Sequence, residues 1–171
     1  MPFPDAFATE RLSFERLTAG HLRELRQFQT NAEVMRYIGG VRSPEQTAAY
    51  FERNLRHWDE HGFGVWVVRE IGQSDMAGIG VLRHLLVEGE DEVETGYGFY
   101  PALWGRGYAM EVATACLEHG FQRFGLASIV AVTHPDNSAS QRVLRKAGMT
   151  YERDFDLDGA RSSLFRIARR D

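Results

Sequence analysis

The chain has 171 residues, of which 43% are hydrophobic and 12% aromatic, enough apolar material for one domain with its own core. Its 20 basic and 24 acidic residues give a formal net charge of -4, which argues against a general nucleic-acid or anionic-membrane binder, because such proteins need a basic excess. The charge does not argue against a cationic substrate. One cysteine cannot form an internal disulfide, and no apolar run approaches the roughly 20 residues of a membrane-spanning helix. The first residues also lack the pattern of a secretory signal, so we expect one cytoplasmic domain over residues 1–171.

The first thirty residues predict an arm, a strand and a helix. Residues 1–8 carry two prolines and little periodicity, which indicates a loose arm. Alternation over residues 11–17 predicts a strand, and Thr18 can cap a helix that runs to about Gln29. The apolar side of this helix would consist of Leu22, Leu25 and Phe28.

Two further helical segments follow. Residues 34–38 predict a short helical piece that the glycines at 39 and 40 end. The run Ser43-Pro44-Glu45-Gln46 is a strong helix start, because serine caps the helix, proline suits its first position and glutamine completes a capping box. We expect this helix to reach His61. Its inward side chains would be Ala48, Phe51, Leu55 and Trp58.

A three-stranded meander is predicted next. Residues 63–71 and 77–87 are rich in valine, isoleucine, leucine and tryptophan, and the polar turn between them indicates a hairpin. A second polar turn over 88–92 leads into a strand over 93–100. One face of that strand would carry Glu94, Gly96, Gly98 and Tyr100. Since glycine has no side chain, this face is almost bare beside its carboxylate, and a ligand can approach the backbone there.

The turn over residues 104–109, Trp-Gly-Arg-Gly-Tyr-Ala, joins this strand to a helical pattern. Its glycines can adopt backbone angles that point several N–H groups at one spot before a helix N-terminus, which is an arrangement that binds phosphates. A glycine pair before a helix is by itself usually only a tight turn. The spacing continues neither as a dinucleotide-binding fingerprint nor as a P-loop.

The last third of the chain predicts a helix, a strand, a helix and two strands. An apolar stripe after the turn indicates a helix that crosses back over the sheet, so the strand over 128–133 should lie parallel to the one over 93–100. Residues 134–137 open a helix that Gly148 closes, and strands over 149–156 and 162–169 flank a turn at Asp158-Gly159. This order of elements predicts an α+β fold with a mixed sheet.

Residues 93–111 resemble the first motif of the GNAT superfamily of acetyl-CoA-dependent N-acetyltransferases, in particular its RimJ/RimL-like branch, which reads close to E-x-G-Y…W-G-x-G-Y-A-x-E. The superfamily writes the turn as Q/R-x-x-G-x-G/A, and this chain gives Trp104-x-x-Gly107-x-Ala109, with the tryptophan that the branch prefers. The element order is similar along the whole chain. The resemblance implies a mixed, mostly antiparallel sheet of about seven strands flanked by about four helices.

The resemblance also implies how acetyl-CoA binds. The backbone of the 104–109 turn would hold the pyrophosphate, and the strand before it would offer backbone groups to the pantetheine arm and to the tetrahedral oxyanion. The Arg106 side chain either adds a charge-assisted bond to a phosphate or stands solvated. The residues assigned to the cofactor in this way are Tyr97, Gly98, Phe99, Trp104, Gly105, Arg106, Gly107, Tyr108, Ala109, Asn137 and Ser140.

Asn137-Ser138-Ala139-Ser140 is the second motif, and by itself it can be an ordinary helix cap. Its match to the family's N-x-x-S implies that Asn137 bonds the pantetheine arm and that Ser140 faces the sulfur of coenzyme A. Many family members protonate the leaving thiolate with a tyrosine at the position of Leu144. That departure leaves Ser140 as the best available hydroxyl.

Glu94 is either a carboxylate at the rim of the sheet or a catalytic base. An amine nucleophile is protonated near neutral pH and must lose a proton before it attacks, and a carboxylate can accept that proton directly or through one water. The family match at this position supports the catalytic role. The expected catalytic residues are therefore Glu94 and Ser140.

These motifs predict the transfer of acetyl from acetyl-CoA to a primary amine by direct attack in a ternary complex. The acceptor is either a protein N-terminus or a small amine such as a polyamine, an aminoglycoside or an amino acid, and a non-catalytic module that senses acyl-CoA is the alternative. By resemblance, residues 19–38 and 154–161 form the acceptor pocket and a homodimer is possible. The six histidines show no metal-ligand spacing, so no metal site is expected. Cys116 belongs to the apolar stripe and is expected in the core. The sequence has no G-x-S-x-G motif, the nucleophile elbow of a hydrolase.

Overall fold

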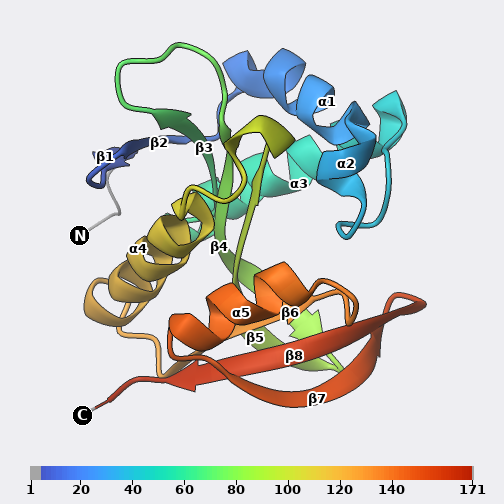
Figure 1. Cartoon of the computed structure of the whole chain (residues 1–171), viewed down its shortest axis with the longest axis vertical. Helices are drawn as coiled ribbons and strands as arrows, with labels where there is room; N and C mark the ends of the chain where they lie inside the picture. The colour runs from blue at the N-terminus through green and yellow to red at the C-terminus, as the bar shows by residue number, and fades with distance from the viewer. Residues whose placement is uncertain (1–4, 171) are drawn as a thin grey trace.

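The computed structural model describes residues 5–170, which form an eight-stranded mixed sheet with helices on its faces (Figure 1). The strand order is β1-β2-β3-β4-β5-β6-β8-β7. The strands are β1 Ala6–Ala8, β2 Leu12–Arg16, β3 Val65–Glu70, β4 Gly78–Val87, β5 Glu90–Phe99, β6 Ser128–Thr133, β7 Thr150–Leu157 and β8 Ala160–Ala168. Neighbours pair antiparallel except β5 and β6, which are parallel, as predicted from the crossover helix between them.

One strand of this sheet was not predicted. The residues expected as a loose arm include β1, which pairs with β2 and places Phe7 opposite Phe14. The two rings stack with their centroids 4.2 Å apart. The prediction of a loose arm is therefore wrong for residues 6–8, because a three-residue edge strand is held by its partner strand and by ring packing, which local periodicity does not reveal. Residues 1–4 of the predicted arm lie outside the described residues.

The helices divide between the two faces of the sheet. They are α1 Leu22–Thr30, α2 Ala32–Met35, α3 Pro44–His61, α4 Tyr108–Gln122 and α5 Ser138–Lys146, with short 3-10 turns at Ala19–His21 and Pro101–Leu103. A Cβ added to Gly80 of β4 would meet Val112 of α4, whereas one added to Gly98 of β5 would meet Phe28 of α1. Gly98 lies opposite Ile79 of β4 and therefore shares its face of the sheet. Ile79 and Gly80 are successive residues, so they face opposite sides of the sheet, and α1 and α4 cover opposite faces.

Two helices differ from the predicted pattern in the residues that they bury. Leu22 was expected inward but is 41% exposed, because a 3-10 turn precedes α1 and shifts the phase of its first residue. Ala48 of α3 was also expected inward and is exposed. The buried face of α3 instead contains Tyr50 and Asn54, which lie against Arg83 of β4. Phe51 and Trp58 are buried as predicted, but hydrophobic periodicity misses the polar part of this face. The capping box of Ser43 and Gln46 forms as predicted.

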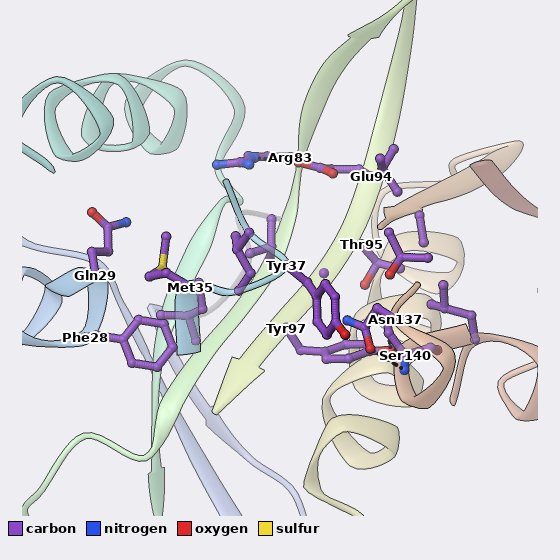
Figure 2. Close-up of a pocket in the computed structure, with 18 of the residues that line it drawn as sticks. Phe28, Gln29, Met35, Tyr37, Arg83, Glu94, Thr95, Tyr97, Asn137 and Ser140 are labelled. Carbon is purple, nitrogen blue, oxygen red and sulfur yellow. Dashed lines mark hydrogen bonds and ion pairs between the residues drawn. The ribbon is translucent and has the colours of Figure 1, made fainter. Parts of the chain in front are cut away.

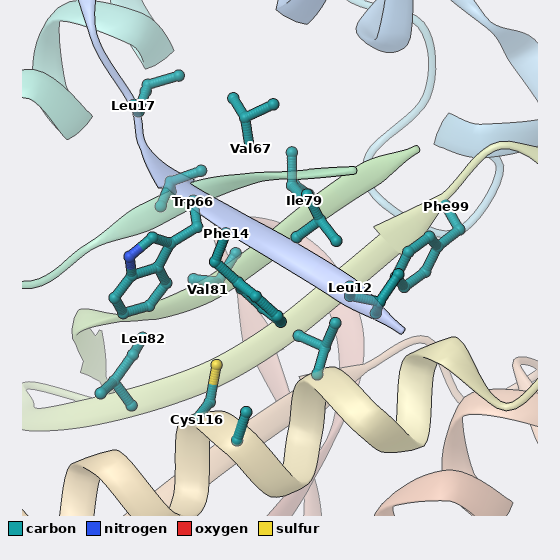
Figure 3. Close-up of a cluster of buried hydrophobic side chains, with 14 of the residues drawn as sticks. Leu12, Phe14, Leu17, Trp66, Val67, Ile79, Val81, Leu82, Phe99 and Cys116 are labelled. Atoms are coloured by element: carbon teal, nitrogen blue, oxygen red, sulfur yellow. The ribbon is translucent and has the colours of Figure 1, made fainter. Parts of the chain in front are cut away.

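One hydrophobic cluster forms the core on both faces of the sheet, and it includes Cys116 of α4, Phe28 of α1 and Trp58 of α3. Figure 3 shows part of it, next to α4. Cys116 is buried in it, as predicted, and this burial raises the pKa of its thiol to about 12. Gly78 allows β4 and β5 to pack closely, since a Cβ there would lie 2.0 Å from the carbonyl oxygen of Gly98. The core thereby fixes β5, which carries Glu94 and Tyr97.

Candidate active site

A cleft opens where β5 and β6 separate. Within residues 5–170, the pairing of these two strands is confined to Glu94 opposite Val130. Beyond that pair, residues 94–97 of β5 and 131–133 of β6 line a cavity of about 140 Å³ instead of pairing. Figure 2 shows the cleft with Phe28, Gln29 and Met35 of α1 and α2 on one side and Asn137 and Ser140 on the other. We call these the acceptor end and the cofactor end of the cleft.

The turn between β5 and α4 has the backbone geometry of an anion site. Gly105 and Gly107 have φ angles of 76° and 81°, in the left-handed region that glycine tolerates, and Gly107 is the N-cap of α4. The backbone N–H groups of residues 105–110 donate no hydrogen bond to any other group between residues 5 and 170. Unpaired N–H groups at a helix N-terminus attract phosphate, so the residues present fit the pyrophosphate of coenzyme A.

Arg11 of the segment between β1 and β2 holds this turn in place. Its Nη1 donates to the carbonyl oxygen of Arg106 at 2.7 Å, and its Nη2 forms an ion pair with Glu111 of α4 at 2.8 Å. Thr9 also donates to Glu111. Burial opposes ionisation of Glu111, but the hydrogen bonds from Thr9 and Arg11 outweigh it and lower the pKa of this carboxyl. Sequence analysis missed Arg11, which lies about a hundred residues from the turn it supports.

The side chains of the turn have partners within the protein. The indole N–H of Trp104 donates to the carbonyl oxygen of Phe99 at 2.8 Å, although the side chain is largely exposed. Arg106 forms an ion pair of 3.3 Å with Glu70, which also accepts a hydrogen bond from the Tyr108 hydroxyl. An exposed pair of this kind contributes about 0–1 kcal/mol. Arg106 therefore does not stand free, but a phosphate can displace its partner at little cost.

Asn137, Ser140 and Tyr97 meet at the cofactor end. The Asn137 side chain accepts a hydrogen bond from the backbone N–H of Ser140 at 3.1 Å, so it does cap α5, and both residues also line the cleft. The Ser140 hydroxyl lies 3.0 Å from the Tyr97 hydroxyl. Burial raises the pKa of Tyr97 to about 12, against an opposing hydrogen bond with Ser140. Sequence analysis assigned only the backbone of Tyr97, and missed its hydroxyl because the contact crosses from β5 to α5.

Glu94 lies in the cleft and forms an ion pair with Arg83. The Arg83 Nε donates to Oε1 of Glu94 at 2.8 Å, and the Arg83 Nη1 donates to the Asn54 side chain at 3.2 Å. Burial opposes the charge of Arg83, but Tyr50 and Glu94 raise the pKa of the guanidinium above its usual value. Sequence analysis missed Arg83, although it stands directly opposite Glu94 in the predicted meander. Glu94 is held on a cationic partner rather than free at a rim.

The glycine-bare face of β5 is covered in part. A Cβ on Gly98 would lie 3.2 Å from Phe28 and 3.4 Å from Ile38, so this glycine admits α1 and the loop after α2 rather than a ligand. That result corrects the expectation of an open face at Gly98. Gly96 does line the cleft. The ring of Tyr37 lies 5.2 Å from that of His134, so the loop after α2 contacts the loop after β6.

The two segments expected to form the acceptor pocket behave differently. Residues between 28 and 38 line the cleft, whereas none of residues 154–161 is among its lining residues. Those residues form the end of the β7–β8 hairpin, where Asp154 forms an ion pair with Arg161.

Among the helices described, none has both the length and the apolar character of a membrane crossing. Across residues 5–170, no three histidine, cysteine, aspartate or glutamate side chains gather as a metal-binding group.

A split mixed sheet whose strand leads through a glycine turn with unpaired N–H groups into a helix is the arrangement expected of a coenzyme A-dependent acetyltransferase. The family model described as "Acetyltransferase (GNAT) domain" matches residues 11–150. The chain therefore belongs to the GNAT acetyltransferase family and is an acyltransferase.

The uncharacterized N-acetyltransferase YoaA of Bacillus subtilis is 31% identical over 146 residues, which cover 84% of this chain and 82% of that protein. The uncharacterized protein YkkB of Bacillus subtilis is 32% identical over 121 residues, 71% of this chain and 70% of the relative.

Solved structures share the fold. A GNAT-family acetyltransferase from Bacillus anthracis is 27% identical with a TM-score of 0.77, over 95% of this chain and 98% of that one. RimL, a ribosomal L7/L12 alpha-N-protein acetyltransferase solved in complex with coenzyme A, has a TM-score of 0.75 at 19% identity and covers 98% of both chains. The predicted family and α+β fold class are confirmed.

Proposed function

We propose that the protein transfers acetyl from acetyl-CoA to a primary amine by direct attack in a ternary complex. One observation carries this proposal: the opening between two separated strands is lined by an ion-paired carboxylate, that of Glu94, and by a pair of hydroxyls, those of Tyr97 and Ser140. Acetyl-CoA supplies the activated thioester, and the chain has to bind it, orient the amine and move two protons.

The turn before α4 and the cofactor end of the cleft are both suited to binding acetyl-CoA. The free N–H groups of residues 105–110 and the positive end of the α4 dipole attract the pyrophosphate. The Asn137 amide nitrogen remains available to the pantetheine arm, because the cap of α5 uses its oxygen. Residues 97–99 offer backbone groups next to the cleft, except that the Phe99 carbonyl already accepts the Trp104 indole.

Glu94 accepts the proton of the incoming amine. Its Oε1 receives the Arg83 hydrogen bond, and among residues 5–170 its Oε2 accepts none, which leaves an oxygen for the amine or for one bridging water. Arg83 and Asn54 fix the carboxylate in one position, as a catalytic base requires.

Ser140 donates the proton that the leaving thiolate takes up. The nearby Tyr97 hydroxyl can in turn pass its own proton to Ser140 and regain one from water, so that the two hydroxyls replace the tyrosine that is absent at position 144. The high pKa of Tyr97 keeps that hydroxyl protonated at neutral pH.

The test is incubation with acetyl-CoA and a panel of peptides, polyamines, aminoglycosides and amino acids. Thiol release is followed, and the acetylated product is identified by mass. We expect one acceptor class to release thiol in equal amount to its product. A protein that binds coenzyme A but acetylates no acceptor, and in which Glu94→Gln changes nothing, would be the acyl-CoA sensor instead.

A further inference from the structure

The acceptor end of the cleft contains a positive charge that the protein does not neutralise. Three charged residues line the cleft, Arg42, Arg83 and Glu94. Arg83 and Glu94 pair with each other, whereas Arg42 forms no ion pair with any carboxylate between residues 5 and 170. The cleft thus carries one excess positive charge.

Arg42 is held in an environment that is unfavourable for a cation. Its Nη1 is buried without a hydrogen-bond partner among the described residues. The Tyr50 ring, whose centre is 4.4 Å from the guanidinium, stabilises it in part, but Arg83 and Arg53 lie over the same ring at 5.4 and 5.7 Å. Burial chiefly, and then the positive charges of Arg83 and Arg53 against an opposing effect of Tyr50, lower the pKa of Arg42. A buried, unpaired guanidinium donor is costly unless an anion completes it.

Gln29 supplies the complementary group. Its side chain is 2% exposed and lines the cleft, and its Oε1 has no hydrogen-bond partner within residues 5–170 (Figure 2). The backbone N–H of Arg42 donates to the backbone oxygen of Gln29 at 3.1 Å, so the two residues are neighbours. The cleft is thus lined by one residue with an unused acceptor and one with an unused donor, which suits a ligand that carries both an amine and an anion.

The rest of the acceptor end is apolar. Phe28, Met35, Ile38, Ile79 and Val81 line it. One excess positive charge matches one carboxylate better than a doubly charged phosphate. A polyamine or aminoglycoside would bring several positive charges to a cleft whose single carboxylate is already paired.

We propose that Arg42 binds a carboxylate of the acceptor, so that the substrate class is an amino acid with an apolar side chain and a free carboxylate. This inference rests on the proposed acetyl transfer and specifies its acceptor. Gln29 accepts a hydrogen bond from the acceptor amine, and Glu94 removes the proton that the amine must lose.

The test compares three acceptors that differ at one group: L-phenylalanine, L-phenylalaninamide and 2-phenylethylamine, each with saturating acetyl-CoA. We expect kcat/KM to be highest for L-phenylalanine by roughly tenfold or more, because a hydrogen bond to a charged group is gained. The amine of L-phenylalaninamide is less basic than that of L-phenylalanine, so a larger fraction of it is the reactive free base. A higher kcat/KM for L-phenylalanine than for its amide therefore cannot result from amine basicity. Equal or higher kcat/KM for the amide or the amine would overturn the proposal and leave acetyl transfer intact.

Arg42→Gln should lower the ratio of kcat/KM between L-phenylalanine and its amide by roughly 10- to 100-fold, mainly through KM. Arg53→Gln is the matched control, since Arg53 lies over the same ring but is exposed and does not line the cleft. It should leave the ratio unchanged. An unchanged ratio in a folded Arg42→Gln protein, or an equal fall in the control, contradicts the proposal.

A second readout does not depend on turnover. Calorimetry should detect binding of N-acetyl-L-phenylalanine but not of N-acetyl-L-phenylalaninamide. If no amine is acetylated while acetyl-CoA binds, the proposed function fails, and this titration alone decides whether Arg42 forms a carboxylate site. Equal binding of the two compounds, or binding of neither, would overturn it.

Discussion

The two ends of the cleft recognise their ligands by different means. The cofactor end, together with the turn before α4, relies mainly on the backbone N–H groups of residues 105–110, and the Arg106 side chain of that stretch pairs with Glu70. The acceptor end relies on side chains from α1, the loop before α3, β4 and β5, including Gln29, Arg42, Arg83 and Glu94. The first end should therefore be sensitive to backbone conformation and the second to single functional groups.

The largest expected effect is on the backbone of the turn. Gly107→Val should abolish acetyl-CoA binding, because Gly107 has φ 81° and a side chain there would also lie 3.4 Å from Arg11. Gly89→Val is the matched control, with φ 87° in the β4–β5 turn and open space around the added atom. The control should lose stability and still bind. Calorimetry that finds unchanged affinity in folded Gly107→Val would refute the role of the turn.

The next largest effect concerns the acceptor end. Glu94→Gln keeps the size of the side chain and removes its basicity, so kcat should fall by roughly 10²-fold with little change in acetyl-CoA affinity. The rate should recover in part as the pH rises, because more of the amine then arrives deprotonated.

Glu92→Gln provides the control for the base. Glu92 lies on the same strand and forms an ion pair of 2.7 Å with Arg166, but it does not line the cleft. Both variants lose one carboxylate–arginine pair, and only Glu94→Gln should lose rate. Wild-type kcat across the pH range in Glu94→Gln would show that deprotonation takes place in solution or at another group.

The same contrast explains what could be predicted from the sequence. The turn could be identified because backbone recognition leaves a local signature, two glycines between a strand and a helix. The capping box of Ser43 and Gln46 could be predicted for the same reason, since it is completed within four residues. The strands of the meander and the parallel placement of β6 followed from periodicity and crossover geometry.

The acceptor end could not be predicted in this way. Arg42, Tyr50 and Arg83 come together only after α3 has packed on the sheet, and polar residues on a buried face do not contribute to a hydrophobic pattern. The contact between Tyr97 and Ser140 likewise depends on how far β5 and β6 separate. The register of the meander, with Arg83 opposite Glu94, is the one signal that could have revealed part of this end.

A smaller effect is expected at Asn137, which serves both the fold and the site. Asn137→Ala should weaken acetyl-CoA binding modestly and lower the free energy of unfolding by about 1 kcal/mol through loss of the cap. Asn31→Ala is a matched control, because Asn31 caps α2 in the same way and does not line the cleft. Both should lose stability, as denaturant unfolding measures, and only Asn137→Ala should lose affinity. Equal acetyl-CoA affinity in the two variants would show that Asn137 serves only as a helix cap.

The smallest effect is expected at the clamp that supports the turn from behind. Because the folded structure lowers the pKa of Glu111 below its usual value of 4.5, the carboxylate stabilises the fold above that pH, and this stabilisation is lost as the pH falls through the lowered value. Glu111→Gln should therefore be less stable than wild type at neutral pH, and the difference should shrink as the pH falls below 4.5. Glu118→Gln, on the exposed side of the same helix, is the control and should leave the stability at neutral pH nearly unchanged. Denaturant unfolding across the pH range measures both variants.

Acetyl-CoA affinity in Glu111→Gln should fall only slightly, since the glycines set the turn and Arg11 still holds the Arg106 carbonyl. A loss as complete as that of Gly107→Val would mean that side chains, and not the backbone alone, build the cofactor end.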